Sequence, residues 1–339
     1  MNSLNVYLVT GGAGFIGSHL IDRLLELNIG NVILLDNFDD YYSPDLKRAN
    51  VEWLQDRHQT RVLDGRFVII QGSINDKQLL TNIFNTYNIT HIAHLAARAG
   101  VRSSSSDIDC YMNVNCVGTQ LLLSFAALHN VKLFVFASTS SVYGQTSTVP
   151  FVETDSCAKP LSPYAATKRS AEILAHVYHN LYGLNVTILR LFNVYGPGGR
   201  PDMMPFKLMR ACIDPTYVVD VFDNGEIKRD WTYIDDVVQA FVAALEVQFG
   251  YEIFNIGCGN PIELSTFIKY IEALSNKHIA KRWMESYRTE PSITYCDNSK
   301  ARRMLNFLPK TNVPDGLEMT WNWFQKYYDQ NDIDNLSSL

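Results

Sequence analysis

Short, continuously apolar runs alternate with amphipathic stretches along most of the chain. Strands that are apolar on both faces are expected in a parallel sheet with helices on both sides. The alternation therefore predicts an α/β fold built on a Rossmann-type, doubly wound parallel sheet. The predicted strands are 6–9, 32–35, 67–71, 91–95, 133–138, 186–190 and 253–256, and the predicted helices are 15–27, 77–87, 109–128 and 164–181.

Two interruptions of this rhythm predict how the chain is divided. The polar segment 39–66 indicates a helical insertion before the third strand, and the glycine- and proline-rich loop after Tyr195 opens a less regular region. We therefore expect a dinucleotide-binding domain and a smaller, interleaved C-terminal α/β lobe that binds the substrate. The expected boundaries are 1–195 with 230–260 for the first, 196–229 with 261–330 for the second, and 331–339 for a polar tail.

Composition narrows the class of protein. With 339 residues, 47% hydrophobic and 19% charged, the chain is typical of a soluble globular enzyme. A net charge of −6 argues against nucleic acid or an anionic membrane as partner, and no apolar run is long enough to cross a bilayer. Six cysteines without a CxxC pair, and no complete metal-ligand set, indicate reduced thiols, a cytoplasmic setting and no metal.

A glycine-rich turn follows the first strand and opens the first helix. Gly11, Gly14 and Gly17 form a GxxGxxG pattern, in which the glycines permit a tight turn, close approach of a pyrophosphate and close packing of helix on sheet. The helix N-terminus supplies amide donors to the anion. Asp36 ends the second strand, where its carboxylate can bond ribose hydroxyls and would repel a 2′-phosphate. NAD is therefore predicted over NADP.

Other cofactor contacts are expected where the chain passes the same edge of the sheet. Small residues after the fourth strand let the backbone approach a dinucleotide closely. The residues expected to join the three glycines and Asp36 at NAD are Phe15, Ile16, Asn37, Ser73, Ile74, Leu95, Ala96, Ala97, Asn115, Tyr164 and Lys168.

A tyrosine and a lysine four residues apart supply the candidate chemistry. Tyr164 and Lys168 lie on the same face of the helix that Ser162 and Pro163 begin. The Lys168 ammonium can stabilise a phenolate on Tyr164, which would lower the pKa of the phenol towards working pH. We expect Tyr164 to act as general base on an alcohol or sugar hydroxyl.

These motifs occur together with several longer stretches. The stretches are 36–42, 97–102, 138–144, 164–168, 195–203 and 229–236. On these stretches, over about residues 5–325, the chain resembles the extended short-chain dehydrogenases/reductases. Within them it resembles the NAD-dependent epimerase/dehydratase family, and most closely the UDP-glucuronate 4-epimerases. The resemblance implies C4 epimerisation of a UDP-sugar through a transient 4-keto intermediate, with NAD regenerated in each cycle.

The resemblance also assigns roles at the sheet edge. It implies that Thr139 bonds the sugar 4-hydroxyl beside Tyr164 and Lys168, and that Asn115 supports the geometry of the site. Sugar 4,6-dehydratases carry Asp and Glu where this chain has Ser140 and Ser141. Two hydroxyls with unshifted pKa values cannot eliminate water, but they can donate hydrogen bonds to a C5 carboxylate.

Substrate contacts are expected mainly in the second lobe. Arg229 matches the family's phosphate-binding arginine, Arg288 is a second candidate, and Glu290 stands where the family usually has an Asp bonding ribose. Arg200 matches an arginine of the glucuronate epimerases that faces the sugar carboxylate or the phosphate. Asn193, however, stands where those enzymes usually have Thr and is more similar to the hexose and N-acetylhexosamine epimerases.

Several alternatives stay open at this point. UDP-glucuronate is the leading substrate, with UDP-glucose or UDP-N-acetylglucosamine as the alternative. Uronate decarboxylation, 4,6-dehydration or a non-catalytic NAD-binding module are less favoured. Broad apolar faces on helices 109–128 and 164–181 predict a homodimer through a four-helix bundle, as the family forms. These faces are carried by Leu121, Leu122 and Phe125 on the first helix and by Ile173, Leu174, Val177 and Tyr178 on the second.

Overall fold

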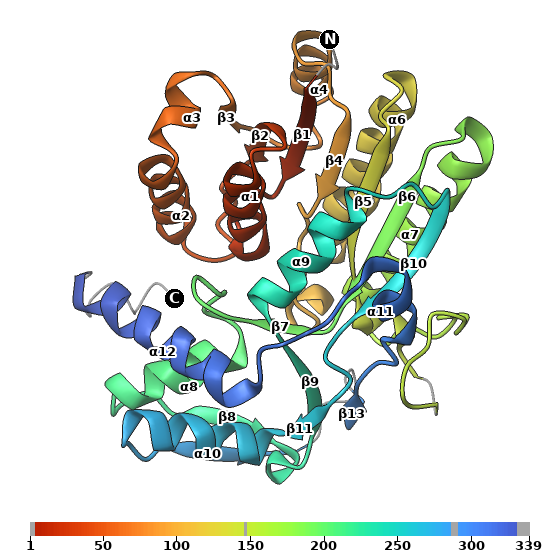
Figure 1. The fold of residues 1–339 in the computed structure, drawn as a ribbon. Helices are drawn as coiled ribbons and strands as arrows, with labels where there is room; N and C mark the ends of the chain where they lie inside the picture. The colour runs from red at the N-terminus through yellow and green to blue at the C-terminus, as the bar shows by residue number, and fades with distance from the viewer. Residues whose placement is uncertain (1–3, 146–147, 286–290, 331–339) are drawn as a thin grey trace.

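A seven-stranded sheet, parallel throughout, forms the centre of the structure, in the order β10-β6-β5-β4-β1-β2-β3 (Figure 1). The computed structural model describes residues 4–145, 148–285 and 291–330, so the predicted tail 331–339 lies outside the described residues. The predicted α/β fold is confirmed. The strands are β1 (Asn5–Thr10), β2 (Gly30–Asp36), β3 (Phe67–Gln71), β4 (His91–His94), β5 (Leu133–Thr139), β6 (Val186–Leu191) and β10 (Tyr251–Ile256).

Helices cover both faces of this sheet because successive strand residues are apolar on opposite sides. Val9 and Leu34 belong to one hydrophobic core, whereas their neighbours Leu8 and Ile33 belong to the other. One face carries α1 and α9, which pack together, and the other carries α4, α6 and α7. These helices are α1 (Phe15–Leu27), α9 (Ile234–Ala244), α4 (Lys77–Thr86), α6 (Thr119–Leu128) and α7 (Pro163–Tyr182).

The helix predicted over 109–128 is not one regular helix. It consists of α5 (Ile108–Tyr111), a π-helical segment η2 (Met112–Gly118) and α6. Asn115 lies buried in the π-helical segment. Its side chain accepts a hydrogen bond from the Arg98 amide and donates one to the Arg98 carbonyl oxygen. A π-helical turn inserts an extra residue, a local adjustment often found at functional sites.

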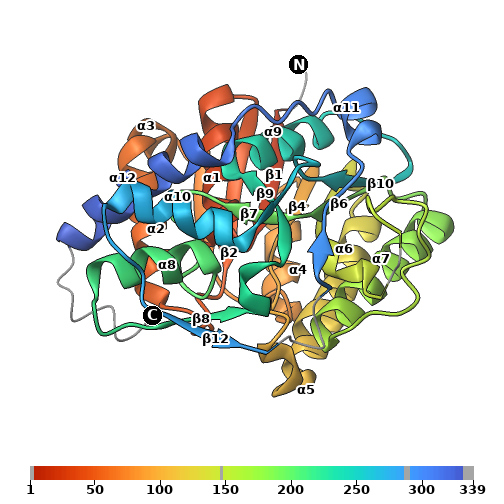
Figure 2. The same cartoon turned by 90° about the horizontal axis from the view of Figure 1, so that it is seen from below.

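A smaller lobe lies below the carboxyl ends of the strands in Figure 1. There α8 and α12 flank α10, as Figure 2 also shows. The polar insertion before β3 is helical, as predicted, with α2 (Pro44–Arg57) and α3 (Gln59–Leu63). The lobe contains β7 (Asn193–Tyr195), α8 (Met204–Ile213), β8 (Val219–Phe222), β9 (Lys228–Tyr233), β11 (Pro261–Glu263), α10 (Leu264–Ser275), β12 (Lys281–Met284), β13 (Ile293–Thr294) and α12 (Val313–Gln330), while α11 (Ser299–Leu305) packs beside β10 and α9.

The lobe's strands pair among themselves rather than with the main sheet. β9 pairs with β7, β11 and β13, and β8 pairs with β12. None of the helices in the described ranges combines the length and apolar character that crossing a membrane requires.

Candidate active site

The turn between β1 and α1 has room only for glycine at two positions. A Cβ on Gly17 would lie 2.2 Å from the carbonyl oxygen of Gly11, and a Cβ on Gly11 would lie 2.7 Å from the amide nitrogen of Ala96. Gly11 also has a φ of +70°, in the left-handed region. The turn therefore packs tightly against the start of α1 and the chain after β4, and the first residues of α1 line the cleft.

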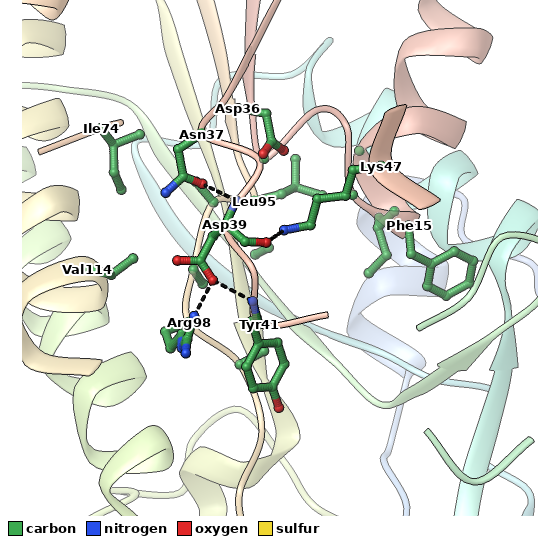
Figure 3. A pocket seen from close by; sticks show the side chains of 18 of the residues that line it. Phe15, Asp36, Asn37, Asp39, Tyr41, Lys47, Ile74, Leu95, Arg98 and Val114 are labelled. Carbon is green, nitrogen blue, oxygen red and sulfur yellow. Dashed lines mark hydrogen bonds and ion pairs between the residues drawn. The ribbon is translucent and has the colours of Figure 1, made fainter. Parts of the chain in front are cut away.

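Asp36 is buried at the end of β2 with both carboxylate oxygens held. Oδ2 accepts a hydrogen bond from the Ala13 amide at 3.1 Å, and Oδ1 accepts one from the Phe38 amide at 2.8 Å. Burial raises the pKa of Asp36, while these amides and the nearby Lys47 ammonium oppose the rise. The carboxylate is thus fixed at the edge of the cavity shown in Figure 3.

One cavity gathers the cofactor residues predicted from sequence, with one exception. Asn115 does not line it; instead its side chain holds the backbone of Arg98, a lining residue, and donates to Thr167 Oγ1 at 3.0 Å. The predicted residues that do line the cavity are Gly11, Gly14, Phe15, Ile16, Gly17, Asp36, Asn37, Ser73, Ile74, Leu95, Ala96, Ala97, Tyr164 and Lys168.

Several polar residues of this cavity were missed by sequence reasoning. Asp39, Tyr41 and Lys47 come from the insertion after β2, and Arg98 from the loop after β4. Figure 3 shows Asp39 between Arg98 and Lys47. The dense polar and aromatic run 36–42 could have indicated that these residues belong to a site. The pairing of Asp39 with Arg98, however, depends on which loops meet at the sheet edge.

A second cavity of about 510 Å³ adjoins the first. It contains the predicted substrate residues Ser140, Ser141, Asn193 and Arg229, together with Thr139. The boundary between the two cavities is where a cofactor and a second ligand could meet. The residues that line both are Phe15, Ile16, Tyr41, Ala99, Ser138, Tyr164, Leu191 and Arg200.

Tyr164 lies at this boundary, beside Thr139. Burial raises the pKa of Tyr164, and the charge of Arg200 and a hydrogen bond with Thr139 partly offset that rise. Thr139 Oγ1 also accepts the Ser141 amide at 3.2 Å, which fixes the hydroxyl at the end of β5. The phenol thus has two groups within reach that favour its deprotonated form.

Lys168 is buried one helical turn after Tyr164. Its ammonium donates to the carbonyl oxygen of Ala137 at 2.9 Å and lies 4.7 Å from the Phe136 ring centroid. Burial lowers the pKa of Lys168 to about 7, although the carboxylate of Glu172, a turn further along α7, opposes the shift. Arg200, rather than Lys168, is the cation whose charge opposes the rise in the pKa of Tyr164.

Arg200 is held in a fork by Asp202. Its Nε lies 2.9 Å from Oδ1 and its Nη2 lies 2.8 Å from Oδ2 of that carboxylate. Burial acts to raise the pKa of Asp202, but the charge of Arg200 outweighs it and keeps the pKa below its usual value. The pair places a cation at the boundary of the two cavities.

Further cations and an aromatic ring lie towards the small lobe. Arg229, on β9, is buried and donates to the carbonyl oxygen of Lys228 at 3.0 Å. Arg102 and Lys207, which sequence reasoning missed, line the second cavity, and Arg102 lies 4.3 Å from the ring centroid of Phe222. These groups suit an elongated anionic ligand.

Two predicted residues cannot be located. Arg288 and Glu290 fall within 286–290, outside the described residues. In the part of the chain that is described, no cluster of three or more His, Cys, Asp or Glu residues could hold a metal ion.

The fold and site define a Rossmann-type protein with a dinucleotide cleft and an adjoining second ligand cavity. Comparison with known proteins gives the family. Residues 7–257 match the NAD dependent epimerase/dehydratase family, and the chain belongs to it. A UDP-glucuronate 4-epimerase from Thermodesulfobacterium geofontis is 40% identical over 322 residues, covering 94% of this chain and 96% of that protein.

Solved structures agree in fold. UDP-glucuronic acid 4-epimerase from Bacillus cereus, in complex with UDP-glucuronic acid and NAD, is 36% identical with a TM-score of 0.87, covering 95% of this chain and 100% of that one. UDP-glucose 4-epimerase from Thermotoga maritima, with UDP-glucose, is 31% identical with a TM-score of 0.84, covering 95% and 99%.

Proposed function

We propose that this protein is an NAD-dependent UDP-sugar 4-epimerase that interconverts UDP-glucuronate and UDP-galacturonate. The observation that carries the proposal is the position of Tyr164, which borders the cofactor cavity and the adjoining cavity at once and lies next to Thr139. The UDP-glucuronate 4-epimerases that the chain matches over nearly its whole length support the choice of reaction.

The first cavity fits NAD. The glycine turn is so tightly packed that a Cβ at Gly17 would collide with the backbone of Gly11, and Asp36 offers an oriented carboxylate of the kind that bonds the ribose hydroxyls of NAD. We propose that the amides at the start of α1 bind the pyrophosphate. When bound, NAD supplies reversible acceptance of a hydride at the sugar's C4.

The chain's own residues handle the proton. In this proposal Tyr164 removes the proton of the 4-hydroxyl while the C4 hydrogen leaves as hydride, which produces a 4-keto sugar. Thr139 holds the same hydroxyl, and Lys168 and Arg200 stabilise the phenolate. After the sugar turns in the cavity, Tyr164 returns the proton as the hydride returns to the opposite face of C4, and the stereocentre is inverted.

The residues after Thr139 favour epimerisation over elimination. Ser140 and Ser141 line the second cavity but offer neither an acid nor a base for removal of water from C5 and C6. We propose that they donate hydrogen bonds to the sugar carboxylate, with Arg200 as the charged partner. Because Nε and Nη2 of Arg200 are bonded to Asp202, we propose that the Nη1 side of the guanidinium meets the sugar carboxylate.

Product analysis tests the proposal directly. The purified protein is incubated with UDP-glucuronate, UDP-glucose and UDP-N-acetylglucosamine in parallel, and the products are identified by proton NMR. We expect UDP-galacturonate from the first substrate with no release of CO₂ and little product from the others. Turnover of the neutral sugars alone would reassign the substrate, and NAD binding without turnover of any UDP-sugar would contradict the proposed activity.

We further propose that the chain works in the cytoplasm, where its six free cysteines stay reduced.

We also propose that the chain forms a homodimer through the helices α5, α6 and α7 and the π-helical segment η2. Leu122 and Phe125, named in the sequence prediction, are buried in the chain's own core. Ile173 and Val177, also named in that prediction, are 52% and 39% exposed, and Leu181 beside them is 63% exposed. Glutamate substitution of Ile173, followed by light scattering, should yield a monomer.

A further inference from the structure

We propose that Asp39, Tyr41 and Arg98 form a strap across the NAD cleft that slows release of the cofactor between turnovers. The three residues line the cofactor cavity from two loops that follow different strands. The inference rests on the proposed function for the identity of the cofactor.

The first end of the strap is fixed to the loop after β2 and to α2. The carboxylate of Asp39 accepts the Tyr41 amide at 2.9 Å, and the Asp39 amide donates to Asn37 Oδ1 at 3.2 Å. Lys47, on α2, donates to the carbonyl oxygen of Asp39. Asp39 is therefore held in place through its backbone as well as its side chain.

The second end is fixed independently, through the π-helical segment. Asn115 Oδ1 accepts the Arg98 amide at 2.8 Å, and Asn115 Nδ2 donates to the Arg98 carbonyl oxygen at 2.9 Å. The same Nδ2 donates to Thr167 Oγ1, next to Lys168 on α7. Arg98 is thus anchored to the helix that carries Tyr164.

An ion pair joins the two ends. Arg98 Nη1 bonds Asp39 Oδ1, as Figure 3 shows. Because β2 and β4 lie on either side of β1, the pair connects the two loops that flank the glycine turn. The side chains are 21% and 36% exposed, whereas Asp36 is 7% exposed, so the pair lies on the outer side of the cavity. A dinucleotide bound at the turn would lie beneath it.

Tyr41 extends the strap to the substrate side. Its ring centroid lies 4.8 Å from Cζ of Arg98 and 5.6 Å from Cζ of Arg200, so one ring contacts the cations of both cavities. Its hydroxyl donates to Asp202 Oδ2 at 3.2 Å, and Asp202 is the partner of Arg200. Opening the strap therefore disturbs the contacts that orient Arg200.

A slow release of NAD has a chemical purpose in this reaction. The hydride taken from C4 has to return to the same sugar, so loss of the reduced cofactor between the two half-reactions would leave a 4-keto product. Residues that retain the cofactor protect the second half-reaction. The strap is a positioning element for this step, without a role in the proton transfer.

The test measures NAD release from the holoenzyme by displacement with excess fluorescent etheno-NAD, in the absence of sugar. Asp39→Asn and Arg98→Met should each release NAD about two- to five-fold faster, as expected for loss of a part-exposed ion pair. The charge-swapped double variant, Asp39→Arg with Arg98→Asp, should release NAD more slowly than either single variant. Asp64→Asn, which removes an equally exposed carboxylate from a pair remote from the cavity, is the matched control and should match the wild type.

Salt gives a second readout, because a part-exposed pair is screened. Raising the ionic strength should speed release from the wild type more than from Arg98→Met. Unchanged NAD release in both single variants would overturn the strap. No recovery in the charge-swapped variant would also overturn it, because Arg98 would then act on the dinucleotide directly. Epimerase assays with added NAD separate the two proposals: an active enzyme with unchanged release contradicts the strap alone, and a protein that binds no NAD contradicts both.

Discussion

The cofactor cavity and the substrate cavity are built in different ways. The first is lined by loops that directly follow β1, β2, β3 and β4, four successive strands of one sheet, with α7 closing it. The second shares the loop after β4 through residues 99–103, but it also collects residues from the end of β5, from β7, from the loop 196–203, from β9 and from β13. The proposed chemistry takes place where the two adjoin, because α7 carries Tyr164 to their boundary and Lys168 to the cofactor cavity beside it. Each prediction below tests one side of this division.

The largest effect is expected at the boundary itself. Tyr164→Phe removes the proposed base and keeps the ring, so kcat should fall by about 10³-fold while NAD and UDP-glucuronate still bind. Steady-state kinetics combined with titration calorimetry of both ligands checks this. Near-normal kcat would show that another group moves the proton.

Arg200→Met tests the substrate side. Losing the guanidinium should lower kcat/KM for UDP-glucuronate by roughly 100-fold. This estimate follows because removing one partner of a buried charge pair typically costs ~3 kcal/mol. Binding of NAD should change little. The neutral UDP-glucose, measured with the same variant, is the internal control. An equal loss on both sugars would assign Arg200 to the phenolate or the diphosphate instead of the carboxylate.

The difference between the cavities also explains what could be predicted from sequence. Gly11, Gly17 and Asp36 were predictable because their roles depend only on the order of elements along a short stretch of chain. The two glycines stand where a strand turns into a helix, and Asp36 stands at the end of the next strand. Arg98 and Asp39 were not, because 59 residues separate them and their pairing requires β2 and β4 to flank β1. The fold class followed from apolar runs that are buried on both faces.

Two details of the helices could not be predicted from the sequence, for tertiary reasons. A regular helix over 109–128 agrees with the apolar spacing, but Asn115 bonds the Arg98 backbone and the chain forms a π-helical turn there. Leu122 and Phe125 have the spacing of an interface helix, yet they pack into the core between α6 and the sheet. Helical periodicity identifies an apolar face without saying whether the chain's own sheet or a second copy covers it.

Gly17→Ala tests the cofactor side. The added Cβ would lie 2.2 Å from the Gly11 carbonyl oxygen, so the turn has to shift. We expect a loss of ~1–3 kcal/mol in stability and at least about tenfold weaker NAD binding, from the displaced pyrophosphate amides. Thermal unfolding and NAD titration measure both. In the control Gly65→Ala, open space surrounds the Cβ, so the unfavourable φ of +72° costs only about 1–2 kcal/mol and NAD affinity stays unchanged.

Lys168→Met tests whether burial of the catalytic cation destabilises the fold. The pKa of Lys168 is about 7 in the folded chain and near 10.5 when unfolded, so between these values the unfolded state binds the extra proton. Wild-type stability therefore rises with pH across this window. The variant should be more stable by on the order of 1 kcal/mol below pH 7, after loss of the bond to Ala137. Because wild-type stability rises by about 1.4 kcal/mol per pH unit across the window, the gain should disappear and then reverse towards pH 10. A stability difference that is flat from pH 6 to 10 contradicts a lowered pKa.

Asn193→Thr should have the smallest effect and bears on the substrate alone. Asn193 lies on β7 and lines the second cavity, where the resemblance to glucuronate epimerases predicts Thr. A shorter hydroxyl side chain should raise the preference for UDP-glucuronate over UDP-glucose by about three- to tenfold, the range of one neutral hydrogen bond. Competition between the two sugars, followed by NMR, measures this ratio without reference to enzyme concentration. If the ratio moves towards the hexose, Asn193 is itself part of the carboxylate site, and this chain recognises the uronate through an amide.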